Sequence, residues 1–322
     1  MTAFTLTRRR LLGALTTLAL SLALPAPSWA AGSDTLRIGY QKYGTLVLLK
    51  AQGTLEKRLA PLGIQVKWAE FPGGPQLLEA LNVGSVDFGT TGETPPIFAQ
   101  AAGADLVYVA HEPPAPKGEG IIVHKDSPIK SVHDLKGKRV ALNKGSNVHY
   151  LLVKALEKAG LKYEDVQTVF LSPSDARAAF ERGSVDAWVI WDPFFAAAEQ
   201  QLGARLVADG VGHVSNHQFY LASRSYADHN AKVVKVIVEE LARLDGWAKQ
   251  NLKEVASQLS SQIGLDANIV KVAADRGTYD VRPLDAKVVA EQQRIADTFY
   301  QLKLIPKKLV VKEIVWTGLG AK

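Results

Sequence analysis

The chain has 322 residues, 47% of them hydrophobic, which is enough to bury two cores of about 100 to 150 residues each. It contains no cysteine, which excludes disulfides, thiolate metal sites, a cysteine nucleophile and a lipid-modified cysteine anchor. The formal net charge is +6, but three arginines at 8–10 lie in a segment that we expect to be removed. The remaining chain is then close to neutral, and we expect no nucleic-acid partner.

The first 30 residues have the features of a secretory export signal. Three arginines at 8–10 precede an apolar run over 11–24, and Ser28-Trp29-Ala30 forms a small-x-small cleavage site. The apolar run is too short to span a bilayer, so we predict cleavage near Ala30 and an unanchored protein in the periplasm. Residues 7–12 also resemble a twin-arginine signal, but three consecutive arginines are common in ordinary signals, and both export routes stay open.

One four-residue motif occurs twice, since Gly84-Ser85-Val86-Asp87 returns as Gly183-Ser184-Val185-Asp186. Similar segments precede and follow both copies. We expect the segments 37–42 and 139–144 each to be a strand that runs into a polar loop, and we expect helices over about 46–59 and 148–159. After each motif come a strand, a carboxylate residue and a helix. The chain is therefore predicted to build one α/β substructure twice, with mainly parallel strands, and to form two lobes.

Proline and glycine mark two crossings between these lobes. The segment 111–118 contains three prolines, which remove backbone donors, and 210–218 carries glycines and polar residues before an apolar strand. We therefore predict a discontinuous first lobe over 31–113 and 218–322, and a second lobe over 114–217. The C-terminal helices have apolar faces at helical spacing and are expected to return to the first lobe.

A family pattern runs through essentially the whole chain after the export signal. It is carried by the segments 36–42, 71–76, 79–87, 91–105, 175–180 and 188–194. Together they resemble the aliphatic sulfonate-binding proteins of bacterial sulfonate importers. The resemblance implies a two-lobed periplasmic binding protein of type II, in which each lobe is a mixed, mostly parallel sheet flanked by helices and the ligand cleft lies between the lobes. It also implies a monomer without cofactor or enzymatic activity, which delivers an organosulfonate to the permease of an ABC importer in the inner membrane.

Other functions of the same fold group stay open. The wider group that this chain resembles also includes binding proteins for taurine, nitrate and pyrimidine precursors. A ligand-sensing partner of a membrane signalling protein would use the same cleft. The enzymes that make the thiamine pyrimidine precursor are a further alternative, but they carry a cysteine-rich motif that this chain lacks.

Motifs for catalysis and metal binding are missing. The sequence has no Gly-x-Ser-x-Gly elbow and no complete phosphate-binding loop. His213 and His217 have a spacing that suits a metal ion, but they lie in a glycine-bearing loop without a nearby ordered carboxylate partner in the sequence. We therefore predict no metal site.

A sulfonate is a monoanion with three acceptor oxygens, so we expect its site to offer neutral hydrogen-bond donors. Helix N-termini supply such donors, because their first N–H groups are unpaired and the helix dipole favours an anion. Polar loops precede four predicted helices, two in each lobe. The candidates in these loops are Gln41, Lys42, Thr91, Gly92, Ser146 and Asn147. Alternatively, these residues only form turns, cap helices or, for the lysine, face solvent.

Four further candidates have more specific roles. A carboxylate repels a sulfonate, so Glu93 and Asp192 either cap helices or receive an amine on the substrate. Asp192 stands before a proline, which favours an N-cap with proline at the first helical position. Trp191 is expected to cover an aliphatic chain, whereas Trp188 is expected in the core. Asn216 either approaches the ligand or belongs to the hinge.

Overall fold

The computed structural model describes residues 34–320. The predicted export signal and its cleavage site lie outside this range. Within it, no helix combines the length and the apolar character that a membrane crossing requires.

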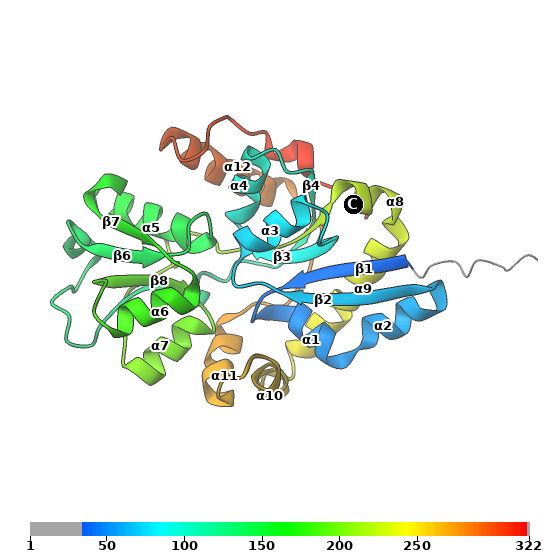
Figure 1. Ribbon diagram of the computed structural model, residues 1–322, viewed down its shortest axis with the longest axis horizontal. Helices are drawn as coiled ribbons and strands as arrows, with labels where there is room; N and C mark the ends of the chain where they lie inside the picture. Colours follow the sequence, from blue (N-terminus) through cyan, green and yellow to red (C-terminus); the bar gives the residue numbers. More distant parts are fainter. Residues whose placement is uncertain (1–33, 321–322) are drawn as a thin grey trace, which may run out of the picture. The chain divides into compact units, whose positions relative to one another are not determined.

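The first lobe contains a five-stranded sheet with the order β2-β1-β3-β10-β4 (Figure 1). Its strands are β1 (Asp34–Tyr40), β2 (Ile64–Glu70), β3 (Phe88–Gly92), β4 (Leu106–His111) and β10 (Gln218–Ser223). β1 pairs parallel with β2 and β3, whereas β10 pairs antiparallel with β3 and β4. Four strands therefore run one way and β10 runs the other.

The second lobe repeats this plan in the order β7-β6-β8-β5-β9. Its strands are β5 (Glu119–Val123), β6 (Arg139–Leu142), β7 (Gln167–Phe170), β8 (Ala187–Trp191) and β9 (Arg205–Asp209). β5 is the reversed strand, since it pairs antiparallel with β8 and β9. In each lobe the reversed strand is the one that arrives directly from the other lobe. The predicted fold of two mixed, mostly parallel sheets in a repeated α/β substructure is confirmed.

The Gly-Ser-Val-Asp motif fastens two strands together in each lobe. The Asp87 carboxylate accepts the backbone N–H of Arg37 at 2.8 Å, and the N–H of Asp87 donates to the Arg37 carbonyl at 2.8 Å. Asp186 makes the same two contacts with Arg139, at 2.7 and 2.8 Å. The motif therefore recurs because each sheet needs the same connection before β3 and β8.

Helices flank both sheets. The first lobe has α1 (Gly44–Gln52), α2 (Thr54–Leu59), α3 (Gly74–Asn82) and α4 (Pro95–Ala101), and the second has α5 (Asn147–Lys158), α6 (Pro173–Glu181) and α7 (Phe194–Leu202). The C-terminal part adds α8 (Arg224–His229), α9 (Ala231–Ala248), α10 (Leu252–Ile263), α11 (Ala267–Arg276) and α12 (Ala286–Gln301). Short 3₁₀ helices are η1 (Ala60–Leu62), η2 (Pro116–Gly118), η3 (Val132–Leu135), η4 (Tyr163–Asp165) and η5 (Val311–Ile314).

The prediction of one continuous helix over 46–59 is wrong. The chain forms α1 and α2, which are separated at Gly53 in the left-handed conformation with φ 60°. Glycine adopts this conformation at little cost and therefore ends α1, although the apolar spacing continues past it. The helix predicted over 148–159 agrees with α5 within one residue at each end.

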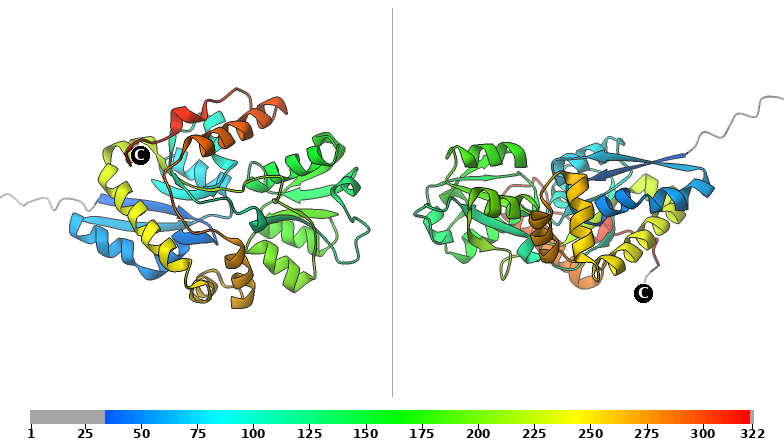
Figure 2. Two further views of the ribbon diagram at one scale, coloured as in Figure 1. Left: turned by 180° about the vertical axis from the view of Figure 1, so that it is seen from behind. Right: turned by 90° about the horizontal axis from the view of Figure 1, so that it is seen from below.

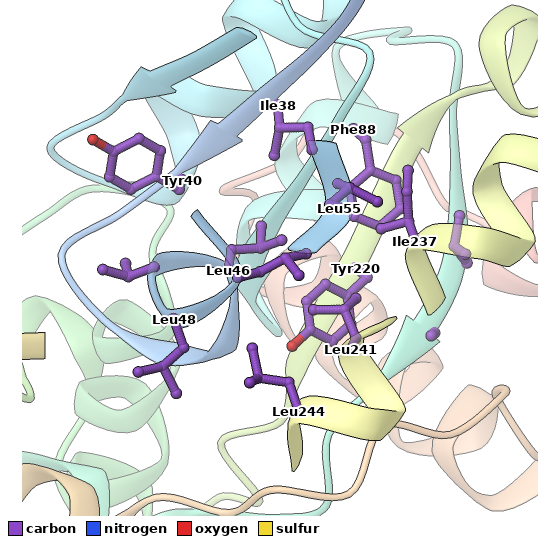
Figure 3. Close-up of a cluster of buried hydrophobic side chains, with 14 of the residues drawn as sticks. Ile38, Tyr40, Leu46, Leu48, Leu55, Phe88, Tyr220, Ile237, Leu241 and Leu244 are labelled. Atoms are coloured by element: carbon purple, nitrogen blue, oxygen red, sulfur yellow. The ribbon is translucent and has the colours of Figure 1, made fainter. Parts of the chain in front are cut away.

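The first sheet packs on α1, α2 and α9 on one face, as Figure 3 shows for Ile38, Phe88 and Tyr220 against Ile237 and Leu241. Two further views show α9 alongside α1 and α2 (Figure 2). Alternate residues of β10 point to opposite faces, as expected of a strand. Its other residues, Phe219 and Leu221, pack with α3, α4 and α12.

The C-terminal helices return to the first lobe, as predicted. α9 and α12 bury the expected apolar faces there, and α10 packs on α1. The prediction was incomplete for α11, which packs both on α10 and on α7 of the second lobe. The second lobe has its own core, in which Trp188 is buried and packs against Phe180. The core position predicted for Trp188 is confirmed.

The two crossings between the sheets run side by side. Glu112 N donates to the Gln218 carbonyl at 2.8 Å, and Ala115 N donates to the Ser215 carbonyl at 3.1 Å. The lobes are predicted to divide at 113/114 and at 217/218. In agreement with this, β5 to β9 form one sheet, and β1 to β4 with β10 form the other. The residue boundaries themselves stay a prediction.

Candidate ligand-binding site

A cavity of about 110 Å³ lies between the two lobes. A water molecule occupies about 30 Å³ in the liquid, so the space suits a small organic molecule. Its wall is formed by the N-terminal ends of α1, α5 and α7, by both crossings and by α10 and α11. Five predicted site residues line it, namely Lys42, Asn147, Trp191, Asp192 and Asn216.

The first lobe presents the beginning of α1 to the cavity. Tyr43 is the N-cap residue, no side chain caps this helix among the described residues, and Gly44 and Thr45 line the cavity. The Tyr43 hydroxyl donates to Gln218 Oε1 at 2.7 Å. Burial raises the pKa of Tyr43, so the phenol stays neutral. The first N–H groups of α1 are therefore placed as donors for an anion.

Gln41 lies behind this wall. Its Nε2 donates to the Thr90 carbonyl at 3.0 Å and to the Tyr43 hydroxyl at 3.2 Å. Thr91 is also behind the wall, where its hydroxyl donates to the Gly92 carbonyl at 3.0 Å. The structure thus connects Gln41 to the cavity through Tyr43.

The second lobe presents the beginning of α5. Asn147 lines the cavity and donates through Nδ2 to Glu119 Oε2 and to Asn216 Oδ1, the latter at 3.1 Å. Asn216 in turn donates to the Ala115 carbonyl at 2.9 Å. Ser146 is the N-cap residue without a side-chain cap, because its hydroxyl donates instead to the Asn143 carbonyl at 2.7 Å. The N-termini of α1 and α5 therefore meet at one cavity from opposite lobes.

Comparison with known proteins identifies the family. Residues 60–251 match the family described as NMT1/THI5 like. A protein of Escherichia coli strain K12 that is named for binding aliphatic sulfonates is 46% identical over 299 residues, which cover 92% of this chain and 93% of that protein. The chain belongs to the aliphatic sulfonate-binding protein family.

Two solved structures of this family have the same fold. The alkanesulfonate-binding protein SsuA from Xanthomonas axonopodis pv. citri, bound to MOPS, is 45% identical with a TM-score of 0.84, over 89% of this chain and 99% of that chain. The periplasmic aliphatic sulphonate binding protein SsuA from Escherichia coli is 47% identical with a TM-score of 0.79, over 88% of this chain and 92% of that chain.

In this sulfonate-binding family member, Asp192 lies in the cavity wall before α7. The predicted N-cap position is wrong by one residue, because α7 begins at Phe194 and the Pro193 carbonyl accepts the first helical N–H, from Ala197 at 2.9 Å. Asp192 nevertheless caps the helix from one residue earlier, since its Oδ1 accepts the N–H of Ala196 at 2.9 Å. The peptide bond between Asp192 and Pro193 is cis.

Glu93, the counterpart of Asp192 in the repeat, does not line this cavity. It is buried at the end of β3, accepts the N–H of His217 at 3.0 Å, and borders a separate open groove of about 950 Å³ between α5 and α12. Burial raises the pKa of Glu93 to about 8. The predicted contact of Glu93 with a ligand stays a prediction that this position does not favour.

Two other carboxyl groups are already hydrogen-bonded, Glu112 in the cavity wall and Asp245 behind it. Glu112 accepts the Tyr220 hydroxyl at 2.8 Å and the N–H of Asp280 at 2.7 Å, while Asp245 accepts the Thr45 hydroxyl at 2.7 Å. Burial, with the neighbouring Asp245, raises the pKa of Glu112 well above its usual range. Both carboxyl groups therefore already accept hydrogen bonds from groups of the wall.

The apolar part of the wall comes from a region without predicted site residues. It consists of Leu259, Ile263, Val270, Ala273 and Ala274 of α10 and α11. Trp191 lines the cavity beside them and packs edge-on against Phe194. The helical spacing in these segments shows that one face is buried, but it does not show that this face reaches the ligand.

The histidines considered for a metal have other contacts. The Nδ1 atom of His217 lies 2.7 Å from the Glu112 carbonyl oxygen, and its Nε2 atom lies 3.1 Å from Glu291 Oε2. His213 borders the open groove. Over residues 34–320, no group of three or more histidine, aspartate or glutamate side chains is placed to hold a metal ion.

Proposed function

We propose that this chain is an extracytoplasmic solute-binding protein that captures aliphatic sulfonates between its lobes. The observation that carries this proposal is the cavity, which is lined both by uncapped helix N-termini from opposite lobes and by apolar side chains of α10 and α11. Such a site fits an anionic head with an apolar tail. The names of its relatives support the same ligand class.

We infer that the sulfonate oxygens accept hydrogen bonds from the first N–H groups of α1 and α5 and from Asn147. Lys42 adds positive charge at the cavity, although its ammonium group also lies 3.6 Å from Glu70. The carbon chain then lies against Trp191 and the apolar residues of α10 and α11. Gln41, Thr91, Gly92 and Ser146 hold these groups from behind.

Delivery to the permease of an ABC importer is part of the proposal. The name of the Escherichia coli relative supports a periplasmic location and a receptor rather than an enzyme. We propose that the receptor is a monomer. Co-purification with an inner-membrane permease, rather than with a membrane signalling protein, is the observation that distinguishes a transport receptor from a sensor.

Ethanesulfonate and butanesulfonate are expected to stabilise the ligand-free protein more than sulfate or nitrate, because only the sulfonates fill the apolar part of the cavity. Binding to the native state alone raises the unfolding free energy by about 2.7 kcal/mol at a hundredfold excess over Kd. A thermal-shift screen of refolded protein, followed by calorimetric titration, measures this.

The same screen tests the alternatives. Taurine differs from ethanesulfonate only by its ammonium group, and we expect it to bind more weakly because the carboxylates at the cavity already have partners. Shifts with nitrate, sulfate or a pyrimidine precursor that equal those of the sulfonates would contradict the sulfonate assignment.

Export is expected to remove the first 30 residues and to release a protein that begins at Ala31. The reason is the Ser28-Trp29-Ala30 site and the absence of a cysteine for lipid attachment. N-terminal sequencing of periplasmic material checks this. A membrane-bound form that keeps the arginines at 8–10 would show that the segment is an anchor.

A further inference from the structure

Helix α11 connects the two lobes at the cavity. Val270 and Ala274 belong to the core of the first lobe and also line the cavity. Ile269, on another side of the helix, forms a separate buried cluster with Ala196 and Ala197 of α7. One short helix therefore contacts the ligand space, the first lobe and the second lobe together.

Arg276 extends this connection in the last turn of α11. Its Nη2 lies 2.7 Å from Glu199 Oε2, its Nη1 lies 3.5 Å from Asp192 Oδ2, and its guanidinium group lies 4.3 Å from the centre of the Phe195 ring. Its side chain is only 21% exposed, so solvent screens these contacts weakly. All three partners belong to the second lobe, beside or within α7.

Asp192 presents a difficulty for an anion-binding site. It lines the cavity, and its side chain is 10% exposed. Its Oδ1 accepts the N–H of Ala196, whereas Oδ2 has no hydrogen-bond donor among the described residues and faces Arg276. Burial raises the pKa of Asp192 to about 6, and the charge of Arg276 opposes this rise. At neutral pH a carboxylate therefore stands in the wall, and Arg276 is the cation placed against it.

We propose that Arg276 is a positioning residue for anion capture, which neutralises Asp192 in the cavity wall and ties α11 to α7 through Glu199. The inference rests on the proposed capture of a sulfonate. Arg276 does not line the cavity and acts through Asp192. Without it, an anionic ligand meets an uncompensated carboxylate, and the lobes lose a charged contact.

The test is a double-mutant cycle with ethanesulfonate as the probe. Arg276→Gln is expected to weaken binding about ten- to hundredfold, mainly through faster dissociation, because it leaves a buried charge unpaired. Asp192→Asn is expected to strengthen binding about two- to threefold, because it removes negative charge from the wall. The double variant is expected to bind within about threefold of the wild type. Calorimetry supplies affinities, and stopped-flow fluorescence supplies rates.

Two further variants separate this role from a contribution to folding alone. Lys271→Gln removes a cation from the exposed side of the same helix, where it pairs with Asp275, and is expected to bind like the wild type. Arg276→Lys keeps the charge but loses the two terminal nitrogens that face Asp192 and Glu199 together. Its affinity for ethanesulfonate is expected to lie between those of the wild type and Arg276→Gln. Thermal melts without ligand show whether each variant is folded.

Unchanged binding by a folded Arg276→Gln would overturn the inference while leaving the proposed function intact. Failure of Asp192→Asn to restore binding in the double variant would overturn the neutralising role. A wild-type protein that binds ethanesulfonate no better than sulfate would overturn the proposed function and this inference together.

Discussion

Replacing Gly92 with alanine is expected to weaken ethanesulfonate binding about ten- to hundredfold while leaving the ligand-free protein folded. A Cβ atom at Gly92, on the first lobe, would lie 2.9 Å from the Cβ, Cγ and Oδ1 atoms of Asn147, on the second. The backbone of Gly92 is not left-handed, so alanine adopts it without strain. The cost therefore falls on the contact between the lobes. Overpacking costs about 1 to 3 kcal/mol, and each 1.4 kcal/mol is about tenfold in affinity.

Gly246 supplies the matched control. It lies inside α9, and a Cβ there meets nothing within 4 Å. Gly246→Ala is expected to leave binding unchanged and to raise stability by about 0.5 to 1 kcal/mol, since glycine disfavours a helix interior. Calorimetric titration and thermal melts of both variants decide the outcome. If Gly92→Ala lowers the unfolding free energy of the ligand-free protein by as much as it weakens the free energy of binding, the contact belongs to the fold and not to capture.

Local patterns in the sequence predict most of the fold. The repeated motif predicts two equivalent sheets because the same hydrogen bonds tie Asp87 to Arg37 and Asp186 to Arg139. Apolar spacing predicts α9 and α12 because each buries one face, and it predicts α5, which is buried over most of its length. Apolar spacing does not predict the break at Gly53, because the spacing continues on both sides of a single residue with a left-handed backbone.

The site was predicted less completely because its contacts join distant parts of the chain. Helix N-termini can be recognised locally, and Asn147 and Asp192 indeed line the cavity. Spacing does not tell which surface the buried faces of α10 and α11 meet. Glu93 and Asp192 occupy equivalent positions in the repeat, yet Glu93 is held by His217, which lies 124 residues further along the chain. Such pairings arise only when the lobes are assembled.

Glu93→Gln is expected to stabilise the ligand-free protein at pH 8 and to leave it nearly unchanged at pH 5. Burial raises the pKa of Glu93 to about 8, from an ordinary value of 4.5, and the nearby Glu291 adds to the rise while the N–H of His217 opposes it. A carboxyl group with a raised pKa favours folding while it is protonated. Its contribution is complete below about pH 4.5 and is lost as the pH rises to about 8.

The size of the effect follows from the shift. One pKa unit corresponds to about 1.4 kcal/mol, so the wild type is expected to lose about 3 to 5 kcal/mol between these limits through this group. Glutamine keeps an oxygen for the N–H of His217 but does not titrate, so the variant avoids the loss. The pKa of Glu119 is also raised, by burial and by the charge of Glu93. Glutamine at position 93 removes that charge, so the loss of stability through Glu119 at high pH is expected to become smaller as well.

Urea unfolding of both proteins without ligand, at several values between pH 5 and pH 8, measures this difference. Glu79→Gln serves as the control, because it removes an exposed carboxylate from α3 and is expected to follow the wild-type curve. The decisive quantity is the gap between the Glu93→Gln and wild-type curves, which must widen as the pH rises. Parallel curves would mean that Glu93 is ionised in the folded protein at little cost, and that water or a cation reaches the carboxylate from the open groove beside it.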